Sequence, residues 1–278
     1  MSPVRLGVVG YLNSRPLVHG LDAEPEAFAL RFDVPSRCAA LLHAGEIDLG
    51  LLPSIEYLRG DYRLVPGVAL ASHGPVASVA VFSTRPLAEV RRIAIDTSSR
   101  TSVALLRVLC AERFGLAPVF VEHRPDLTAM LRVADAALLI GDPALWTDHA
   151  ARGLEKVDLG AEWSVHTGLP FVWACWTGRP GAAGPATVAR LVRARDEGVA
   201  AVDRIAARYA GGDAERARGA VAYLRHNMKF GLGPREESAL RRFYASAARL
   251  GIVPAGPEPR FYDRAEAPAT VLGAARSV

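Results

Sequence analysis

A chain of 278 residues can bury a large core and is long enough for one large or two modest domains. Half of its residues are hydrophobic and 22% are charged, a composition that excludes a disordered or fibrous chain. The net charge of +4 comes from arginines that are spread along the sequence without a basic run. This pattern favours small anionic ligands and argues against nucleic acid as a partner.

Three cysteines lie far apart, each in an apolar segment, at Cys38, Cys110 and Cys175. An odd number without paired spacing argues against a disulfide framework and against a zinc site, so we expect buried free thiols in a reducing cytoplasm. The first strand pattern starts at Val4 with no basic and apolar leader before it, so no secretory signal is expected. No apolar run is long enough to span a membrane.

Short strand patterns alternate with helix patterns over roughly the first 180 residues. The expected strands are Arg5–Val9, Ala29–Asp33, Ile47–Leu51, Ser78–Ser83, Arg92–Ile95, Val119–His123, Ala136–Ile140 and Val172–Trp176. Helices are expected between them, for example over Ser36–Ala44 and Ser102–Phe114. Apolar strands that alternate with helices predict parallel α/β sheets with both faces covered.

The C-terminal part of the chain has a different pattern. Helical spacing of apolar residues predicts three long helices, over Val188–Tyr209, Ala214–Asn227 and Pro234–Leu250. The tail after Pro254 is rich in Pro, Gly and Ala, and we expect it to wrap the surface. The sequence contains no internal repeat and no signal for an oligomeric state.

Three strand patterns end in small or polar residues, in the segments Val8–Pro16, Ile47–Ser54 and Leu138–Pro143. Ligands of parallel sheets bind beyond the carboxyl ends of the strands. Because such strand ends occur in both halves of the α/β region, we expect a cleft between two lobes.

Five hydroxyl residues and one arginine lie between a strand and a helix, in the segment Asp96–Ser102. The first turn of a helix has unpaired N–H donors and the positive end of the helix dipole, so it binds anions readily. Arg100 could add a bidentate fork to a carboxylate. We therefore expect a carboxylate or phosphate site here, since capping the helix would need one hydroxyl only.

Other polar residues at the strand ends have two explanations each. Asn13 and Arg15 could fix a hydroxyl or a carboxylate, whereas Asn13 or Ser14 could equally cap a short helix with Pro16 in its first turn. Asp142 follows a glycine and precedes a proline, which favours helix capping.

Several common kinds of catalytic site are missing from the sequence. Ser78 starts an apolar strand, but no serine lies in a G-x-S-x-G elbow, which argues against a serine hydrolase. The histidines show no metal-ligand spacing, and glycine-rich phosphate loops are absent. We therefore expect no metal and no nucleotide cofactor, and no strong base is apparent.

The chain resembles the chorismate dehydratase family, which catalyses the first step of the futalosine route to menaquinone. Six ordered motifs between roughly residues 4 and 178 carry this resemblance: Gly10–Leu17, Asp48–Tyr57, Gly74–Val79, Thr97–Ser102, Ala137–Asp142 and Thr167–Val172. The resemblance implies an α/β, two-lobed periplasmic-binding-protein-like (type II) fold with a central cleft. It implies one lobe from residues 1–80 plus 178–278 and a second from 81–177, with crossings near Val81–Thr84 and Trp176–Arg179.

The reaction implied is the loss of water from chorismate to give 3-[(1-carboxyvinyl)oxy]benzoate, with no cofactor. The resemblance places Asn13 and Ser78 at the reacting centre. It places Ser99, Arg100, Thr101 and Ser102 near the ring carboxylate. It implies further substrate contacts from Tyr11, Ser14, Arg15, Ser54, Gly141 and Asp142. The base stays open, and the enolpyruvyl carboxylate of the substrate itself is one candidate.

Two alternative functions remain at this stage. One is 1,4-dihydroxy-6-naphthoate synthase of the same pathway, which shares the fold but whose expected catalytic histidine context is not seen here. The other is a non-catalytic solute-binding protein for a small carboxylate, which would be expected to carry a signal peptide.

Overall fold

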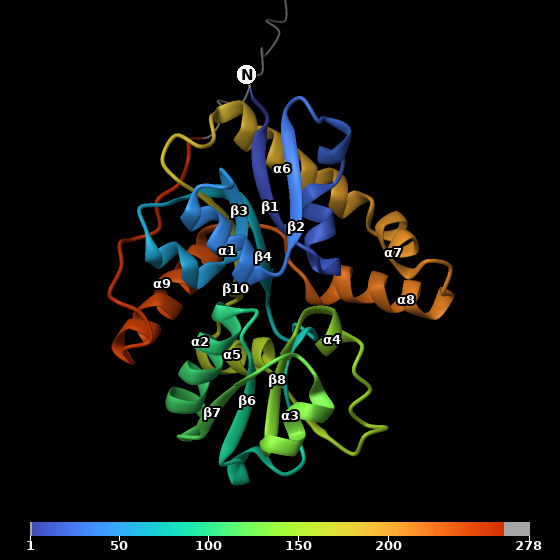
Figure 1. The fold of residues 1–278 in the computed structure, drawn as a ribbon, viewed down its shortest axis with the longest axis vertical. Helices are drawn as coiled ribbons and strands as arrows, with labels where there is room; N and C mark the ends of the chain where they lie inside the picture. Colours follow the sequence, from blue (N-terminus) through green and yellow to red (C-terminus); the bar gives the residue numbers. More distant parts are fainter. Residues whose placement is uncertain (1, 264–278) are drawn as a thin grey trace, which may run out of the picture.

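A computed structural model of the chain describes residues 2–263 and shows two five-stranded sheets in that range, one above the other in Figure 1. The first sheet has the order β2-β1-β3-β10-β4, formed by Phe28–Asp33, Val4–Val9, Leu49–Pro53, Phe171–Gly178 and Arg63–Ser72. The second has the order β7-β6-β8-β5-β9, formed by Val119–His123, Arg92–Asp96, Ala136–Ile140, Val79–Ser83 and Glu155–Asp158.

Helices flank both sheets. The α-helices that precede β10 in the chain are α1 Pro35–Ala44, α2 Arg100–Leu109, α3 Leu127–Val133, α4 Gly141–Leu145 and α5 Leu159–Thr167. The C-terminal helices are α6 Pro185–Ala200, α7 Val202–Ala210, α8 Ala214–Ala222 and α9 Pro234–Arg249. Two 3-10 helices, η1 (Leu12–Val18) and η3 (Ser54–Arg59), and a short π-helix, η6 (Tyr223–Asn227), complete the elements that build the site. In the described residues no helix is long and apolar enough to cross a membrane.

Both sheets are mixed, which corrects the expectation of parallel sheets. In the first sheet β1 runs parallel to β2 and β3, whereas β10 is antiparallel to β3 and β4. In the second sheet β6 runs parallel to β7 and β8, whereas β5 is antiparallel to β8 and β9. The reason is the route of the chain. The parallel strands of each sheet run towards the boundary between the two sheets. β5 and β10 start at this boundary, because each follows directly after a crossing from the other sheet, and they therefore run in the opposite direction.

The strand pairings also locate the two crossings between the sheets. All of β5 pairs in the second sheet, and all of β10 pairs in the first. The chain therefore crosses between Ser72 and Val79 and again between Thr167 and Phe171. The proposed lobe limits at 80/81 and 177/178 fall inside these strands, so a division at 78/79 and 170/171 fits the pairings better.

Two strands were not expected from the sequence. β4 contains Pro66-Gly67, which is typical of a turn, and Gly67 has a φ of +79°. The ladder between β4 and β10 shifts register around this pair, so the strand continues past a bulge. β9 is a strand of four residues whose sequence, Glu-Lys-Val-Asp, is mostly charged. It lies at the edge of the second sheet, where charged side chains are tolerated.

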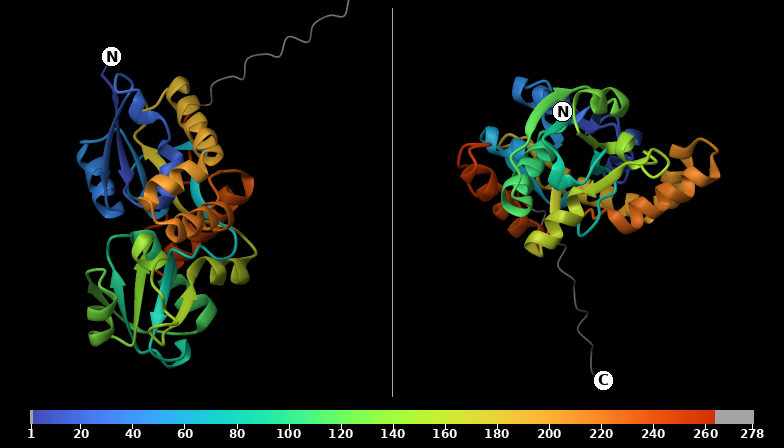
Figure 2. Two further views of the ribbon diagram at one scale, coloured as in Figure 1. Left: turned by 90° about the vertical axis from the view of Figure 1, so that its right-hand side faces the viewer. Right: turned by 90° about the horizontal axis from the view of Figure 1, so that it is seen from below.

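Of the helices after β10, α6 and α9 pack on strands of the first sheet, and α7 and α8 lie next to the boundary between the sheets (Figures 1 and 2). α9 packs on β10 and also on α2 of the second lobe. The aromatic rings of Trp163, Phe171 and Phe243 join there, with centroids 4.9–6.1 Å apart. Edge-to-face packing of this kind stabilises the boundary beyond the area that it buries.

Candidate functional site

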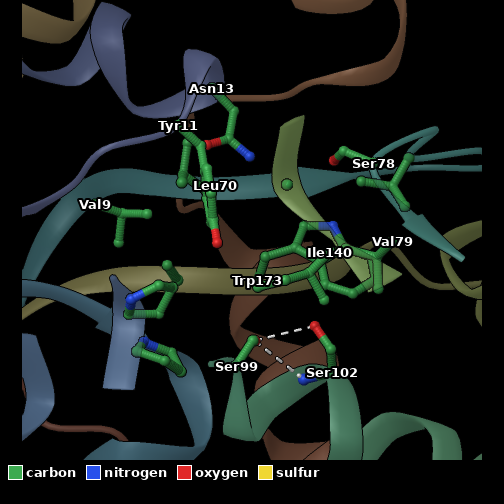
Figure 3. Close-up of a pocket in the computed structure, with 15 residues that line it drawn as sticks. Val9, Tyr11, Asn13, Leu70, Ser78, Val79, Ser99, Ser102, Ile140 and Trp173 are labelled. Atoms are coloured by element: carbon green, nitrogen blue, oxygen red, sulfur yellow. Dashed lines mark hydrogen bonds between the residues drawn. The ribbon is translucent and has the colours of Figure 1, made fainter. Parts of the chain in front are cut away.

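A pocket of about 470 Å³, which includes space open to solvent, lies between the two sheets (Figure 3). The first sheet and its loops contribute Tyr11 and Asn13 after β1, together with Trp173 of β10. The second lobe contributes Ser78 before β5 and two serines at the start of α2. The strand ends that the sequence singled out in each half therefore meet at one pocket.

Asn13 and Ser78 share one hydrogen-bond partner. Asn13 Nδ2 donates to the hydroxyl of Tyr223 at 3.1 Å, and Ser78 Oγ lies 2.7 Å from the same hydroxyl. Asn13 Oδ1 is buried and has no hydrogen-bond partner among the described residues. An amide oxygen in this condition can accept a hydrogen bond from a ligand at little desolvation cost.

The loop that presents Ser78 is held in an uncommon conformation. Ala77 has a φ of +62°, in the left-handed region that non-glycine residues rarely adopt. Asp158 accepts the backbone N–H groups of Val76 at 3.0 Å and Ala77 at 2.7 Å. The backbone oxygen of Ser78 accepts Gly141 N–H at 2.8 Å. The position of Ser78 is therefore fixed by backbone bonds on both sides.

Tyr11 lies in the pocket against Gly141. A Cβ atom at position 141 would stand 2.7 Å from the Tyr11 ring, and Gly141 has a φ of +62°, so glycine is required here on both counts. Burial raises the pKa of the Tyr11 hydroxyl, and the nearby carboxylates of Asp96 and Asp142 raise it further. Tyr11 therefore stays a neutral hydroxyl donor at physiological pH.

Only part of the hydroxyl-rich turn faces the pocket. Ser99 is the N-cap of α2, and its Oγ lies 3.0 Å from Ser102 Oγ; both serines line the pocket. Thr101 instead accepts Ile55 N–H at 3.1 Å and lies 3.5 Å from Ser54 Oγ. Ser54 donates to the carbonyl of Val172 at 2.7 Å. Thr101 and Ser54 therefore join the two lobes behind the pocket rather than line it.

Arg100 does not reach the pocket in this structure. Its Nη1 lies 3.0 Å from both carboxylate oxygens of Glu56, a side chain with no solvent exposure. His43 Nε2 at 3.0 Å and Arg59 Nε at 3.4 Å also contact this carboxylate. A charge buried this deeply needs such partners. The guanidinium of Arg100, which the sequence analysis assigned to a substrate carboxylate, therefore binds a carboxylate of the protein itself.

The remaining predicted residues have structural contacts. Ser14 Oγ donates to the carbonyls of Val9 and Tyr11, at 2.5 and 2.8 Å. The guanidinium of Arg15 lies over the ring of Phe32, 4.8 Å from its centroid. None of these contacts orients Ser14 or Arg15 towards the pocket.

Asp142 joins the two lobes next to the pocket. Its carboxylate accepts Leu12 N–H at 3.1 Å and the hydroxyl of Tyr209 at 2.9 Å. The neighbouring Gly141, by contrast, lines the pocket.

Two residues at the site were missed from the sequence. Tyr223 lies in a helical segment, where an aromatic residue is typical of a core position. Trp173 forms part of the pocket wall and donates from its indole to Ser72 Oγ at 3.0 Å. Within residues 2–263, no three His, Cys, Asp or Glu side chains gather in a way that could hold a metal ion.

Comparisons with solved structures show the fold. A protein from Archaeoglobus fulgidus superposes with a TM-score of 0.71 at 19% identity, over 90% of this chain and 98% of that one. The periplasmic aliphatic sulphonate binding protein of Escherichia coli superposes with a TM-score of 0.65 at 17% identity, over 96% of each chain. The fold is therefore that of periplasmic binding proteins, as the sequence resemblance predicted.

Comparisons of sequence show the family. The chain is 35% identical over 224 residues to the chorismate dehydratase of Thermus thermophilus, which covers 74% of this chain and 81% of that protein. It is 30% identical over 164 residues to the chorismate dehydratase of Campylobacter jejuni, which covers 59% and 58% of the two chains. A family model described as menaquinone biosynthesis matches residues 4–249. The chain therefore belongs to the menaquinone biosynthesis family.

Proposed function

We propose that this chain is a chorismate dehydratase that converts chorismate into 3-[(1-carboxyvinyl)oxy]benzoate in the futalosine route to menaquinone. The family match and the two dehydratase relatives support this reaction. The structural observation that carries it is the pairing, in one pocket, of Asn13 and Ser78 with the serines at the start of α2. Chorismate is a small ring with two carboxylates and one ring hydroxyl, which matches such a set of donors and acceptors.

The chemistry needs acid, base and charge stabilisation only. One ring C–H bond and one ring C–O bond break, a C=C bond forms, and the departing hydroxyl leaves as water. The electrons of the C–H bond stay in the ring, which becomes aromatic, so no oxidant or reductant takes part. The hydrogen is acidic because the carbanion that it leaves behind is conjugated with the ring carboxylate.

Ser99 and Ser102 are proposed to bind the ring carboxylate. Their hydroxyls and the positive end of the ten-residue helix α2 would stabilise the negative charge that develops as the proton leaves. Asn13 and Ser78 lie on the opposite side of the pocket in Figure 3 and are proposed to bind the ring hydroxyl. Arg100 and Thr101 would act here indirectly, by fixing α2 against the first lobe.

The proposed base is the enolpyruvyl carboxylate of the substrate. In the described residues the pocket lining contains no His, Lys, Asp or Glu side chain. The enolpyruvyl group is attached to the ring carbon that loses its hydrogen, so its carboxylate can reach that hydrogen within one molecule. Intramolecular delivery of this kind gives high effective molarities.

The test is to incubate the purified protein with chorismate, without added metal or cofactor, and to follow the product by mass spectrometry. We expect a product lighter by one water, formed at an undiminished rate in the presence of a chelator. Binding of chorismate without turnover would contradict the proposal and indicate a solute-binding protein. Turnover of a cyclic futalosine derivative instead would indicate the naphthoate synthase of the same pathway.

The matched variant for this test is Asn13→Ala. An interaction made mainly in the transition state lowers turnover more than affinity when it is removed. We expect this variant to bind the product nearly as wild type and to turn over at least about 100-fold more slowly. Wild-type turnover in the folded variant would remove Asn13 from the reacting centre.

The proposed setting is the cytoplasm. All three cysteines are buried free thiols in the structure, as a reducing compartment would keep them. The proposed partner is the small-molecule substrate, with no nucleic acid and no membrane.

A further inference from the structure

One buried tyrosine connects the two side chains that are proposed to act on the ring hydroxyl. Tyr223 begins η6, far along the chain from both of them, and its side chain does not line the pocket. Its hydroxyl accepts Asn13 Nδ2–H at 3.1 Å and lies 2.7 Å from Ser78 Oγ. Tyr223 is 3% exposed, so no bulk water competes for these two bonds.

The direction of the hydrogen bonds follows from the number of protons. A tyrosine hydroxyl has one proton to donate. Either hydroxyl of the Tyr223–Ser78 pair can donate, but donation by Ser78 would leave the buried tyrosine proton without an acceptor among the described residues, so we assign Ser78 Oγ as the acceptor of that bond. The proton of Ser78 is then left for the pocket, and so is Asn13 Oδ1, which is buried without a partner.

We propose that Tyr223 is a positioning residue that fixes this direction, so that the pocket presents one acceptor, Asn13 Oδ1, and one donor, the Ser78 O–H. The inference rests on the proposed function. A hydroxyl group is the ligand that matches this pair, because it donates one hydrogen bond and accepts another. In chorismate the ring hydroxyl would donate to Asn13 and accept from Ser78, and the Ser78 bond strengthens as the C–O bond breaks and charge builds on the oxygen.

The environment of Tyr223 keeps it in the required state. Burial is the largest influence on its hydroxyl and raises its pKa well above the usual value near 10.0, so the group keeps its proton at all physiological pH values. The hydroxyl therefore remains both an acceptor for Asn13 and a donor for Ser78 throughout the working range of an enzyme.

The test is Tyr223→Phe, which removes the hydroxyl and keeps the ring. We expect kcat for chorismate to fall about 10- to 100-fold, with the dissociation constant of the product changed by less than about threefold. The control is Tyr57→Phe, because the Tyr57 hydroxyl is also buried and also makes two hydrogen bonds, with Glu258 and Arg260, but lies outside the pocket lining. Tyr57→Phe should lower the melting temperature and leave kcat within about twofold of wild type.

A second measurement separates positioning from a loss of stability. Ser78→Ala should lower kcat in the wild-type background but lower it by less than a further factor of about three in the Tyr223→Phe background, because the two residues act as one unit.

Asn13→Asp should lower kcat as well, since a carboxylate would accept the tyrosine proton and withdraw it from Ser78. If Tyr223→Phe does not fold, Asn13→Asp alone decides: wild-type kcat in that variant overturns the inference.

Two results would overturn the inference directly. One is a folded Tyr223→Phe protein with kcat within about twofold of wild type, and the other is full additivity with Ser78→Ala. Failure of the proposed function looks different, because the wild-type protein itself would then give no product from chorismate in the same assay.

Discussion

Asp96 ends β6 as a carboxylate that is 1% exposed, directly before the serine-rich turn. Its Oδ1 accepts Ser98 N–H at 2.9 Å, whereas its Oδ2 has no partner among the described residues. Burial raises the pKa of this carboxyl above its ordinary value of 3.8, and the bonds from Ser98 reverse only part of that effect. The ionised form is therefore destabilised in the folded protein, next to the site at which an anionic substrate is proposed to bind.

Replacing this carboxyl by an amide should change the pH dependence of stability. A group whose pKa is raised by folding contributes stability below its unfolded pKa, and that contribution is lost as the pH rises through its folded pKa. We expect wild type to lose stability relative to Asp96→Asn as the pH increases from below 3.8 towards neutrality. Urea unfolding of both proteins at a series of pH values measures the difference. A difference that stays constant with pH would show that burial does not shift this carboxyl.

Single residues divide clearly into those that the sequence could reveal and those that it could not. Asn13, Ser99 and Ser102 lie where a strand ends or a helix begins, so the sequence pattern made them candidates for a ligand site. Ser78 became a candidate only through the family resemblance, because a serine at the start of a strand is typical of a turn. Tyr223 was not a candidate, because its partners lie 145 and 210 residues away and nothing local distinguishes it from a core tyrosine. Arg100 was expected to bind a carboxylate of the ligand; in the structure it binds the carboxylate of Glu56, a partner 44 residues away that the sequence pattern does not reveal.

At the scale of elements, one carboxylate serves both a helix and a loop. Asp158 caps α5 by accepting Gly160 N–H at 2.9 Å and Ala161 N–H at 3.0 Å. The same side chain holds the loop before Ser78 through Val76 and Ala77. The start of a helix and the position of a proposed catalytic hydroxyl therefore depend on the same carboxylate.

Asp158→Ala should therefore reduce both stability and turnover. Loss of an N-cap costs about 0.5–2 kcal/mol of unfolding free energy, and the two loop N–H groups would lose their acceptor as well. Asp213→Ala is the matched control, since Asp213 caps α8 in the same way, through Glu215 and Arg216, but holds no loop of the pocket. Urea unfolding and steady-state kinetics on both variants separate the roles. Equal kcat values for the two variants would contradict a role of Asp158 in placing Ser78.

The elements that could be predicted are those with strong local patterns. The eight strands that the sequence predicted and α1 were placed within two residues of their observed limits. β4 was missed because a Pro-Gly pair inside a strand has the local signature of a turn. The direction of β5 and β10 depends on which sheet each strand enters, and a strand pattern does not contain that information.

At the scale of the whole molecule, several contacts join one lobe to the other around the pocket. The ion pair of Arg100 with Glu56 lies on one side, and the bond from Leu12 to Asp142 lies on another. Ser36 N–H also donates to the carbonyl of Ser98 at 3.0 Å, between the two lobes. The strength of such contacts determines how readily the two lobes separate, so it affects both affinity and rate.

The comparison of Arg100→Ala with Glu56→Gln tests what Arg100 does. If its part is to close the lobes, both variants should lose roughly 1–3 kcal/mol of unfolding free energy and raise KM to a similar extent. If Arg100 also binds a substrate carboxylate, Arg100→Ala should raise KM about 10-fold or more above the value for Glu56→Gln. Unchanged stability in both variants would contradict the closing role of this ion pair.

The pairing of β4 with β10 has a topological consequence. Ser72 ends β4 and lies opposite Phe171, the first residue of β10, in an antiparallel ladder. The strands that leave and re-enter the first sheet are thus hydrogen-bonded neighbours, and a short reverse turn could connect them directly as a hairpin. The whole second lobe is then an insertion into the tip of a β-hairpin, and its two attachment points lie side by side. Such a lobe can bend about one narrow base without disturbing the ladder that carries it.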